Sequence, residues 1–181
     1  GSEIFEDIQS WKYDVIVMYN MSQKITEKQK ANLLALLERG VGLVVLHHAI
    51  ANYPDWPEYW KIIGTRYFLE DVTENGVKHP KSEYEHGVDY KVHVEDPVHP
   101  ITKGVVDFGI NDETYKGYTI DPGNHIILTT DHPKCQKEIG WTRTYGKSRV
   151  CYLQMGHGDS IFADANYQRL VMQAVKWTAE K

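Results

Sequence analysis

Gly42-Leu43-Val44-Val45-Leu46-His47-His48-Ala49, the stretch from residue 42 to residue 49, decides the fold. Its first five residues carry no charged or polar side chain, which is typical of a strand buried on both faces of a parallel sheet. Two histidines follow at once. Ligands of open α/β sheets bind beyond the carboxyl ends of the strands, so the sequence places His47 and His48 at an expected binding edge.

The residues before this strand predict the first half of a βαβ unit. Residues 15–19, Val-Ile-Val-Met-Tyr, form another short apolar run. Thr26 with Gln29 three residues later has the capping-box pattern of a helix start, and Gly40 is placed to end that helix. A strand, a helix and a strand within about 35 residues predict two parallel strands joined by a right-handed crossover.

The rest of the chain predicts helices packed on a mixed sheet. A short helix is expected over residues 57–63, with proline in its first turn, and an amphipathic helix over 167–178. Residues 64–87 are polar and irregular and predict a long loop over the sheet edge. Strands are expected over residues 88–94, 115–120, 126–129, 139–145 and 150–155. These elements indicate a single α/β domain over residues 1–181.

The composition excludes several classes of protein. The net charge is −5 with histidine counted as neutral, and no basic run is present to neutralise the phosphates of a nucleic acid. No apolar stretch approaches the ~20 residues of a membrane span. We therefore expect neither a nucleic-acid partner nor a membrane. The oligomeric state stays open, a homo-oligomer included, and the compartment stays unassigned with the cytoplasm slightly favoured.

The sequence contains no recognisable nucleophile. Cys151 lies in the apolar run 149–153, where a small buried side chain is expected, and its spacing from Cys135 is not that of a metal site. There is no G-x-S-x-G elbow, Walker A loop, G-x-G-x-x-G or H-E-x-x-H motif. The elbow-like turn after the strand of residues 42–46 carries His47 where a nucleophile would be.

Histidine is unusually frequent, with nine in the chain, and imidazole is the commonest metal ligand and titrates near neutrality. His157 lies between Gly156 and Gly158 at the end of an expected strand, where small neighbours let a ligand or a second loop approach. We interpret His47 and His157 as functional. His48 reaches the same site only if the backbone turns, because adjacent residues of an extended chain point in opposite directions.

An acidic pair supplies a third part of the predicted site. Of Asp112 and Glu113 we prefer Glu113, which alternates with Tyr115 onto one face of a strand. A carboxylate beside two or three imidazoles is typical of a metal site or of an acid–base pair. Arg66 offers a fork for oxyanions, and Tyr67 offers a ring for stacking on a sugar.

Five segments together resemble the ThuA-like (trehalose-utilisation) family. They are residues 43–49, 64–68, 96–102, 112–115 and 156–158, which read LVVLHHA, GTRYF, DPVHPIT, DETY and GHG. The resemblance covers nearly the whole chain. It implies a flavodoxin-like three-layer sandwich, similar to class I glutamine amidotransferases, with a mixed, mostly parallel sheet. In those relatives a cysteine occupies the elbow. Here His47 takes the place of that cysteine, and His157 resembles the histidine at a later strand end. The chain therefore has no thiolate that could attack glutamine.

The resemblance also implies additional residues before this chain. Family members usually begin with a further strand, helix and strand, the first of these strands being central. This chain begins just before the expected third strand, residues 15–19. Because the loss of a central strand exposes two edges, we expect the natural protein to have the missing N-terminal strands. For the same reason we expect residues 15–19 not to form an exposed edge.

Three functions remain open. The first is a metal-assisted enzyme of carbohydrate catabolism, which holds a divalent ion (zinc or similar) and acts on a small-molecule sugar or keto-sugar of the trehalose type. The second is a non-catalytic sugar-binding or regulatory module, favoured by 12 Tyr and 5 Trp. The third is a degenerate amidotransferase or amidase that lacks its nucleophile.

The residues predicted for the first function fall into three groups. The catalytic group is His47, Glu113 and His157, and the metal ligands are His47, His48, Glu113 and His157. The predicted substrate-binding residues are Arg66, Tyr67, Tyr115 and Asp159. The remaining histidines are expected on the surface or in turns, and they are His79, His86, His93, His99, His125 and His132.

Overall fold

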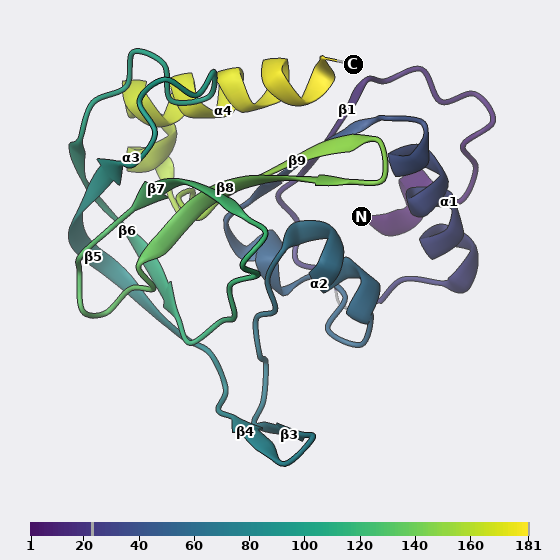
Figure 1. Ribbon diagram of the computed structural model, residues 1–181, viewed down its shortest axis with the longest axis horizontal. Helices are drawn as coiled ribbons and strands as arrows, with labels where there is room; N and C mark the ends of the chain where they lie inside the picture. Colours follow the sequence, from purple (N-terminus) through teal and green to yellow (C-terminus); the bar gives the residue numbers. More distant parts are fainter. Residues whose placement is uncertain (23, 181) are drawn as a thin grey trace.

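A seven-stranded mixed sheet runs through the computed structural model, which describes residues 1–22 and 24–180 (Figure 1). Along the sheet the strand order is β1-β2-β9-β8-β7-β5-β6. The strands are β1 (Val15–Met18), β2 (Gly42–Leu46), β5 (Glu83–Val94), β6 (Phe108–Lys116), β7 (His125–Thr129), β8 (Glu138–Tyr145) and β9 (Ser148–Leu153). The last strand of the chain therefore lies between β2 and β8.

The predicted βαβ unit is confirmed. Thr26 caps helix α1 (Glu27–Glu38), because its side chain accepts from the backbone N–H of Gln29 while the Gln29 side chain accepts from the Thr26 N–H. β1 and β2 pair in parallel, and β2 pairs in parallel with β9. The carboxyl ends of these three strands therefore meet at one end of the sheet.

Two hydrophobic layers cover the two faces of the sheet. Leu43 of β2 packs in one core with α1 and with the short helix α2 (Pro57–Ile63). Its neighbour Val44 packs in the other core with helix α4 (Ala165–Ala179). Burial on both faces explains why β2 is apolar throughout. The helix–sheet–helix layers confirm the predicted three-layer α/β fold.

Antiparallel pairing makes up the other half of the sheet. β8 pairs with β9 and with β7, and β5 pairs with β7 and with β6. The parallel pairings are confined to β1, β2 and β9. The sheet is mixed, as predicted, and two of its three parallel strands, β2 and β9, lead into the segments that carry the candidate histidines.

The segment 64–87 is not the single loop that its polar sequence predicts. It contains a hairpin of β3 (Val72–Glu74) and β4 (Val77–His79), which projects from the body of the domain in Figure 1. The turn between these strands is Asn75-Gly76, with φ values of 52° and 78°. Asn-Gly is the strongest short hairpin signal, because both residues tolerate the left-handed conformation. The hairpin therefore has a clear signal in the sequence.

The strand expected over residues 115–120 begins and ends earlier, as β6. Gly117 follows β6 with a φ of 82°, which breaks the extended conformation. Asp112 and Glu113 are consequently inside a strand and not in a turn before it. At the C-terminal end, a one-turn helix α3 (Asp159–Phe162) precedes α4. No helix among the described residues is long and apolar enough to cross a membrane.

β1 forms one edge of the sheet. Ile16 and Met18 are buried, but Val17 between them is 48% exposed, since α4 lies mainly over β2 and β9. The expectation that residues 15–19 would not form an exposed edge is therefore wrong for this chain. The additional strands before them stay a prediction.

Candidate functional site

The site begins at the sharp turn after β2. His47 has a φ of 52°, in the left-handed region that non-glycine residues rarely adopt. It opens a short 3-10 helix, His47–Ala51, directly after the strand. Its side chain is fully buried. The elbow predicted from the sequence is therefore present, and it carries an imidazole. Backbone strain of this kind collects at functional sites.

The residues after β9 lie against this elbow. Leu46 is the pairing partner of Leu153, so the chain leaving β9 passes His47. Within this segment, Gly156 packs against His47 and has a φ of 139°. A Cβ at this position would be 3.3 Å from the His47 Cβ and 2.9 Å from the Tyr167 hydroxyl. Neither the conformation nor the space accepts a side chain. This explains the glycine before His157.

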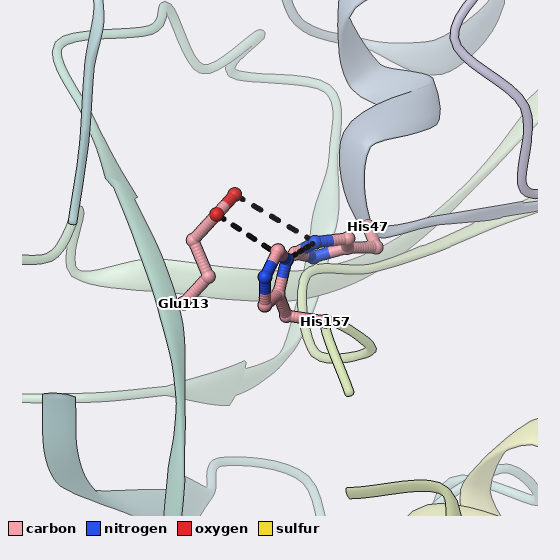
Figure 2. Close-up of side chains that lie close together, drawn as sticks. All are labelled: His47, Glu113 and His157. Carbon is pink, nitrogen blue, oxygen red and sulfur yellow. Dashed lines mark hydrogen bonds and ion pairs between the residues drawn. The ribbon is translucent and has the colours of Figure 1, made fainter. Parts of the chain in front are cut away.

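The two acids of β6 have separate roles. Asp112 accepts hydrogen bonds from the backbone N–H groups of Gly156 at 2.8 Å and His157 at 2.9 Å, so it fixes the loop that carries His157. Burial raises the pKa of Asp112. Glu113, also buried, points the other way and faces both His47 and His157 (Figure 2). The alternation along the strand thus supports Glu113 as the site carboxylate.

Three ligand atoms converge in the space between these elements. The Nε2 atom of His47 lies 3.3 Å from Nδ1 of His157 and 3.7 Å from Oε1 of Glu113, and Nδ1 of His157 lies 3.3 Å from Oε2 of Glu113 (Figure 2). Ligands bound about 2.0–2.1 Å from a tetrahedral ion are about 3.3 Å apart. The two imidazole nitrogens have this spacing, and one ligand atom from each of the three side chains lies within 4.8 Å of the other two.

The hydrogen bonding of His47 directs the acceptor nitrogen of its ring at the site. Its Nδ1 atom lies 2.8 Å from the carbonyl oxygen of Gln154, which can only accept, so Nδ1 carries the proton. Burial lowers the pKa of His47 to about 4, so the ring is neutral at pH 7. The lone pair on Nε2 then faces Glu113 and His157. Metal-binding histidines are oriented in this way by carbonyl groups.

Two aromatic groups complete the surroundings of His47. The Tyr115 hydroxyl lies 3.0 Å from Nε2 of His47, and burial raises the pKa of this phenol, which therefore stays protonated as a hydrogen-bond donor. His48 is not part of this group of ligand atoms and packs on the Tyr19 ring, with 4.7 Å between the ring centres. Three of the four predicted ligands, His47, Glu113 and His157, therefore lie together, and His48 is not one of them.

His86 is the site residue that the sequence analysis missed. It was expected on the surface, and its side chain is indeed 59% exposed. Yet its Nδ1 atom lies 2.6 Å from Oε2 of Glu113, and its ring centre lies 4.6 Å from that of His157. Gly87, which follows His86, is the signal in the sequence, because a glycine inside a strand often marks a bulge.

A family model described as ThuA, trehalose utilisation, matches residues 2–178. The chain belongs to the ThuA family. This confirms the resemblance stated from the sequence motifs. No curated protein sequence matches the chain.

Several solved structures share the fold, and two of them are described as putative ThuA-like proteins. One from Parabacteroides merdae is 20% identical, with a TM-score of 0.77, and the match covers 98% of this chain and 74% of that one. One from Bacteroides uniformis is 23% identical, with a TM-score of 0.71 and coverage of 98% and 71%. A cytoplasmic protein of Salmonella typhimurium is 15% identical, with a TM-score of 0.67 and coverage of 97% and 76%. At these sequence identities the comparisons show a shared fold and nothing more.

Beside the three ligand atoms, this ThuA-family chain has a cavity of about 290 Å³. Tyr67 and Tyr115, two of the residues predicted to bind substrate, line it together with Glu113. The two phenol rings pack edge to face, 5.6 Å apart, and burial raises the pKa of Tyr67 to about 12. The other lining residues are Met21, His48, Ile50, Ala51, Leu69, Lys81 and Tyr84.

Arg66 and Asp159 are placed elsewhere. Arg66 points away from Tyr67 into a different pocket, where its guanidinium lies 3.7 Å above the Trp60 ring and 2.7 Å from the Glu74 carboxylate. Asp159 is exposed at the start of α3. The structure does not bring either side chain to the cavity.

Neither cysteine of this ThuA-family chain faces the ligand atoms as a thiolate. Cys151 is fully buried in β9 and packs in the core under α4, and burial raises its pKa. Cys135 is also buried, and the burial raises its pKa in the same way. A thiol in such surroundings is inert. The elbow position that holds a cysteine in the amidotransferase resemblance is occupied by His47.

Proposed function

We propose that this chain is a metal-dependent enzyme of carbohydrate catabolism that acts on a sugar or keto-sugar. The observation that carries the proposal is the spacing of three ligand atoms, from His47, Glu113 and His157, which all lie within 4.8 Å of one another. They converge at the carboxyl ends of parallel strands, where α/β proteins bind ligands. Two nitrogens and one carboxylate oxygen suit zinc or a similar divalent ion and leave coordination positions open.

The bound ion would polarise a sugar carbonyl or acidify a water molecule. The chain's own residues would bind and orient the substrate and move protons. Tyr67 and Tyr115 offer rings with polar ends, which suit the mixed apolar and polar faces of a sugar. The protonated Tyr115 hydroxyl, 3.0 Å from Nε2 of His47, is positioned to donate to an oxygen near the ligand atoms. Hydrolysis, isomerisation and elimination are all compatible with this arrangement.

Metal analysis of the purified protein tests the first step. We expect about one equivalent of divalent ion per chain in the wild type after incubation with Zn²⁺ and removal of the excess. His47→Ala should hold less than a tenth of that amount, because it removes a ligand at the centre of the set. His99→Ala is the control, since His99 packs on Trp177 far from the elbow. Equal metal content in the wild type and His47→Ala would remove the proposed metal site.

A second function, a non-catalytic sugar-binding module, is favoured by the tyrosine-lined cavity itself. A thermal-shift screen with mono- and disaccharides and their keto derivatives should find a stabilising ligand for either function. Turnover of that ligand, followed by product analysis, would support the enzyme. Stabilisation that is lost in Tyr115→Ala, with no turnover by the metal-loaded wild type, would support the module.

A further inference from the structure

A bulge in β5 lies directly opposite the site carboxylate. β5 and β6 pair regularly on either side of it, but the register shifts between Glu85 and Val88. The two residues in between, His86 and Gly87, face the single residue Glu113 of β6. In a regular ladder only one residue would do so. Bulges of this kind turn a side chain from its usual direction, and they are frequent beside active sites.

The glycine of this bulge is required for its conformation. Gly87 has a φ of 65°, in the left-handed region, although a Cβ at this position would meet no atom within 4 Å. Space therefore does not explain the absence of a side chain. The sequence His-Gly instead permits the local backbone that aims the His86 ring at β6.

The ring aimed in this way contacts one particular oxygen of Glu113. The Nδ1 atom of His86 lies 2.6 Å from Oε2, which is also 3.3 Å from Nδ1 of His157, whereas the other oxygen, Oε1, faces Nε2 of His47. Two ligands of one tetrahedral ion would be about 3.3 Å apart, so 2.6 Å is the distance of a hydrogen bond and not of two ligands sharing an ion. His86 is thus placed to donate to the carboxylate.

We propose that His86 is a positioning residue of the metal site, which holds the Glu113 carboxylate with Oε1 directed at the ion. This inference rests on the proposed function. Its physical basis is that a carboxylate rotates freely unless its second oxygen is held, and hydrogen bonds to ligating carboxylates raise metal affinity. His86 itself is 59% exposed, so its side chain adds little packing to the fold. The bond and the bulge that directs it therefore serve the geometry of the site.

A competition titration with Zn²⁺ and a chromophoric chelator tests this role. His86→Ala should bind Zn²⁺ about 10–100-fold more weakly than the wild type. His86→Asn should bind within about threefold of the wild type, because its amide N–H can replace the donor at Nδ1. His125→Ala is the matched control: His125 is 56% exposed and its Nε2 lies 2.8 Å from the Asp96 carboxylate, outside the site. It should bind as the wild type does.

A second measurement separates positioning from folding. The visible absorption of the Co²⁺-loaded protein should change in His86→Ala. The melting temperature of the metal-free protein should stay within about 4 °C of the wild-type value, because the His86 side chain is 59% exposed. If His86→Ala binds Zn²⁺ as tightly as a wild type that does bind it, the role of His86 is refuted and the metal site stands. If the wild type binds no divalent ion, both proposals fall.

Discussion

The Nδ1 atom of His47 lies 2.8 Å from the carbonyl oxygen of Gln154, a residue 107 positions later in the chain. This bond exists because β9 inserts beside β2 in parallel register, so that the ends of both strands meet. It fixes the proton on Nδ1 and leaves Nε2 as an acceptor toward Glu113 and His157. The sheet topology thus determines the chemical state of the imidazole as well as its place.

The buried, neutral state of His47 predicts a loss of stability in acid. Its pKa is lowered by burial from 6.5 to about 4. Below pH 6.5 the unfolded chain takes up a proton that the folded chain does not, so stability falls as the pH falls from 6.5 toward 4. The full effect is roughly 3 kcal/mol. Urea unfolding of metal-free wild type and His47→Gln at pH 7.5, 6 and 4.5 should show a smaller loss in the variant. Parallel pH profiles would contradict it.

Asp112 offers a test of how the His157 loop is held. Its two carboxylate oxygens accept from the N–H groups of Gly156 and His157. Asp112→Asn replaces one acceptor by an NH₂ group, which leaves a buried N–H unpaired and costs about 1–3 kcal/mol. Metal affinity should fall together with the stability. Glu113→Gln is the comparison, since it should reduce metal affinity with little loss of stability. The idea fails if Asp112→Asn unfolds at the wild-type urea concentration.

The sequence predicts this site well where parallel strands end. His47 and His157 follow from the ends of parallel strands, and Glu113 follows from the alternation of side chains along β6, because strand ends and alternation are local properties. The contact of His86 could not be predicted, since it depends on the register shift opposite Glu113, and pairing register is not contained in one strand. Arg66 was expected beside Tyr67 in the cleft, but adjacent extended residues point to opposite sides.

Gly156 should tolerate no side chain, and Gly158 supplies the control. Gly156→Ala would place a Cβ 3.3 Å from the His47 Cβ at a φ of 139°. We expect a loss of about 1–3 kcal/mol in unfolding free energy from the strained backbone, and weaker Zn²⁺ binding as His47 is displaced. Gly158→Ala has no atom within 4 Å of the new Cβ and an extended φ of −152°. Equal unfolding free energies for the two variants would show that the close approach is unimportant.

Tyr115→Phe separates metal binding from proton transfer. The hydroxyl it removes lies 3.0 Å from Nε2 of His47, where it donates to the lone pair that an ion would occupy. Without this competing donor, Zn²⁺ affinity should stay at the wild-type level or rise. The rate of turnover, once a substrate is found, should fall by about 10²–10⁴-fold if the phenol supplies a proton. Tyr13→Phe changes a phenol that is 61% exposed and does not line the cavity, and it should alter neither quantity. A Tyr115→Phe protein that loses Zn²⁺ affinity more than threefold would instead make the phenol oxygen a ligand.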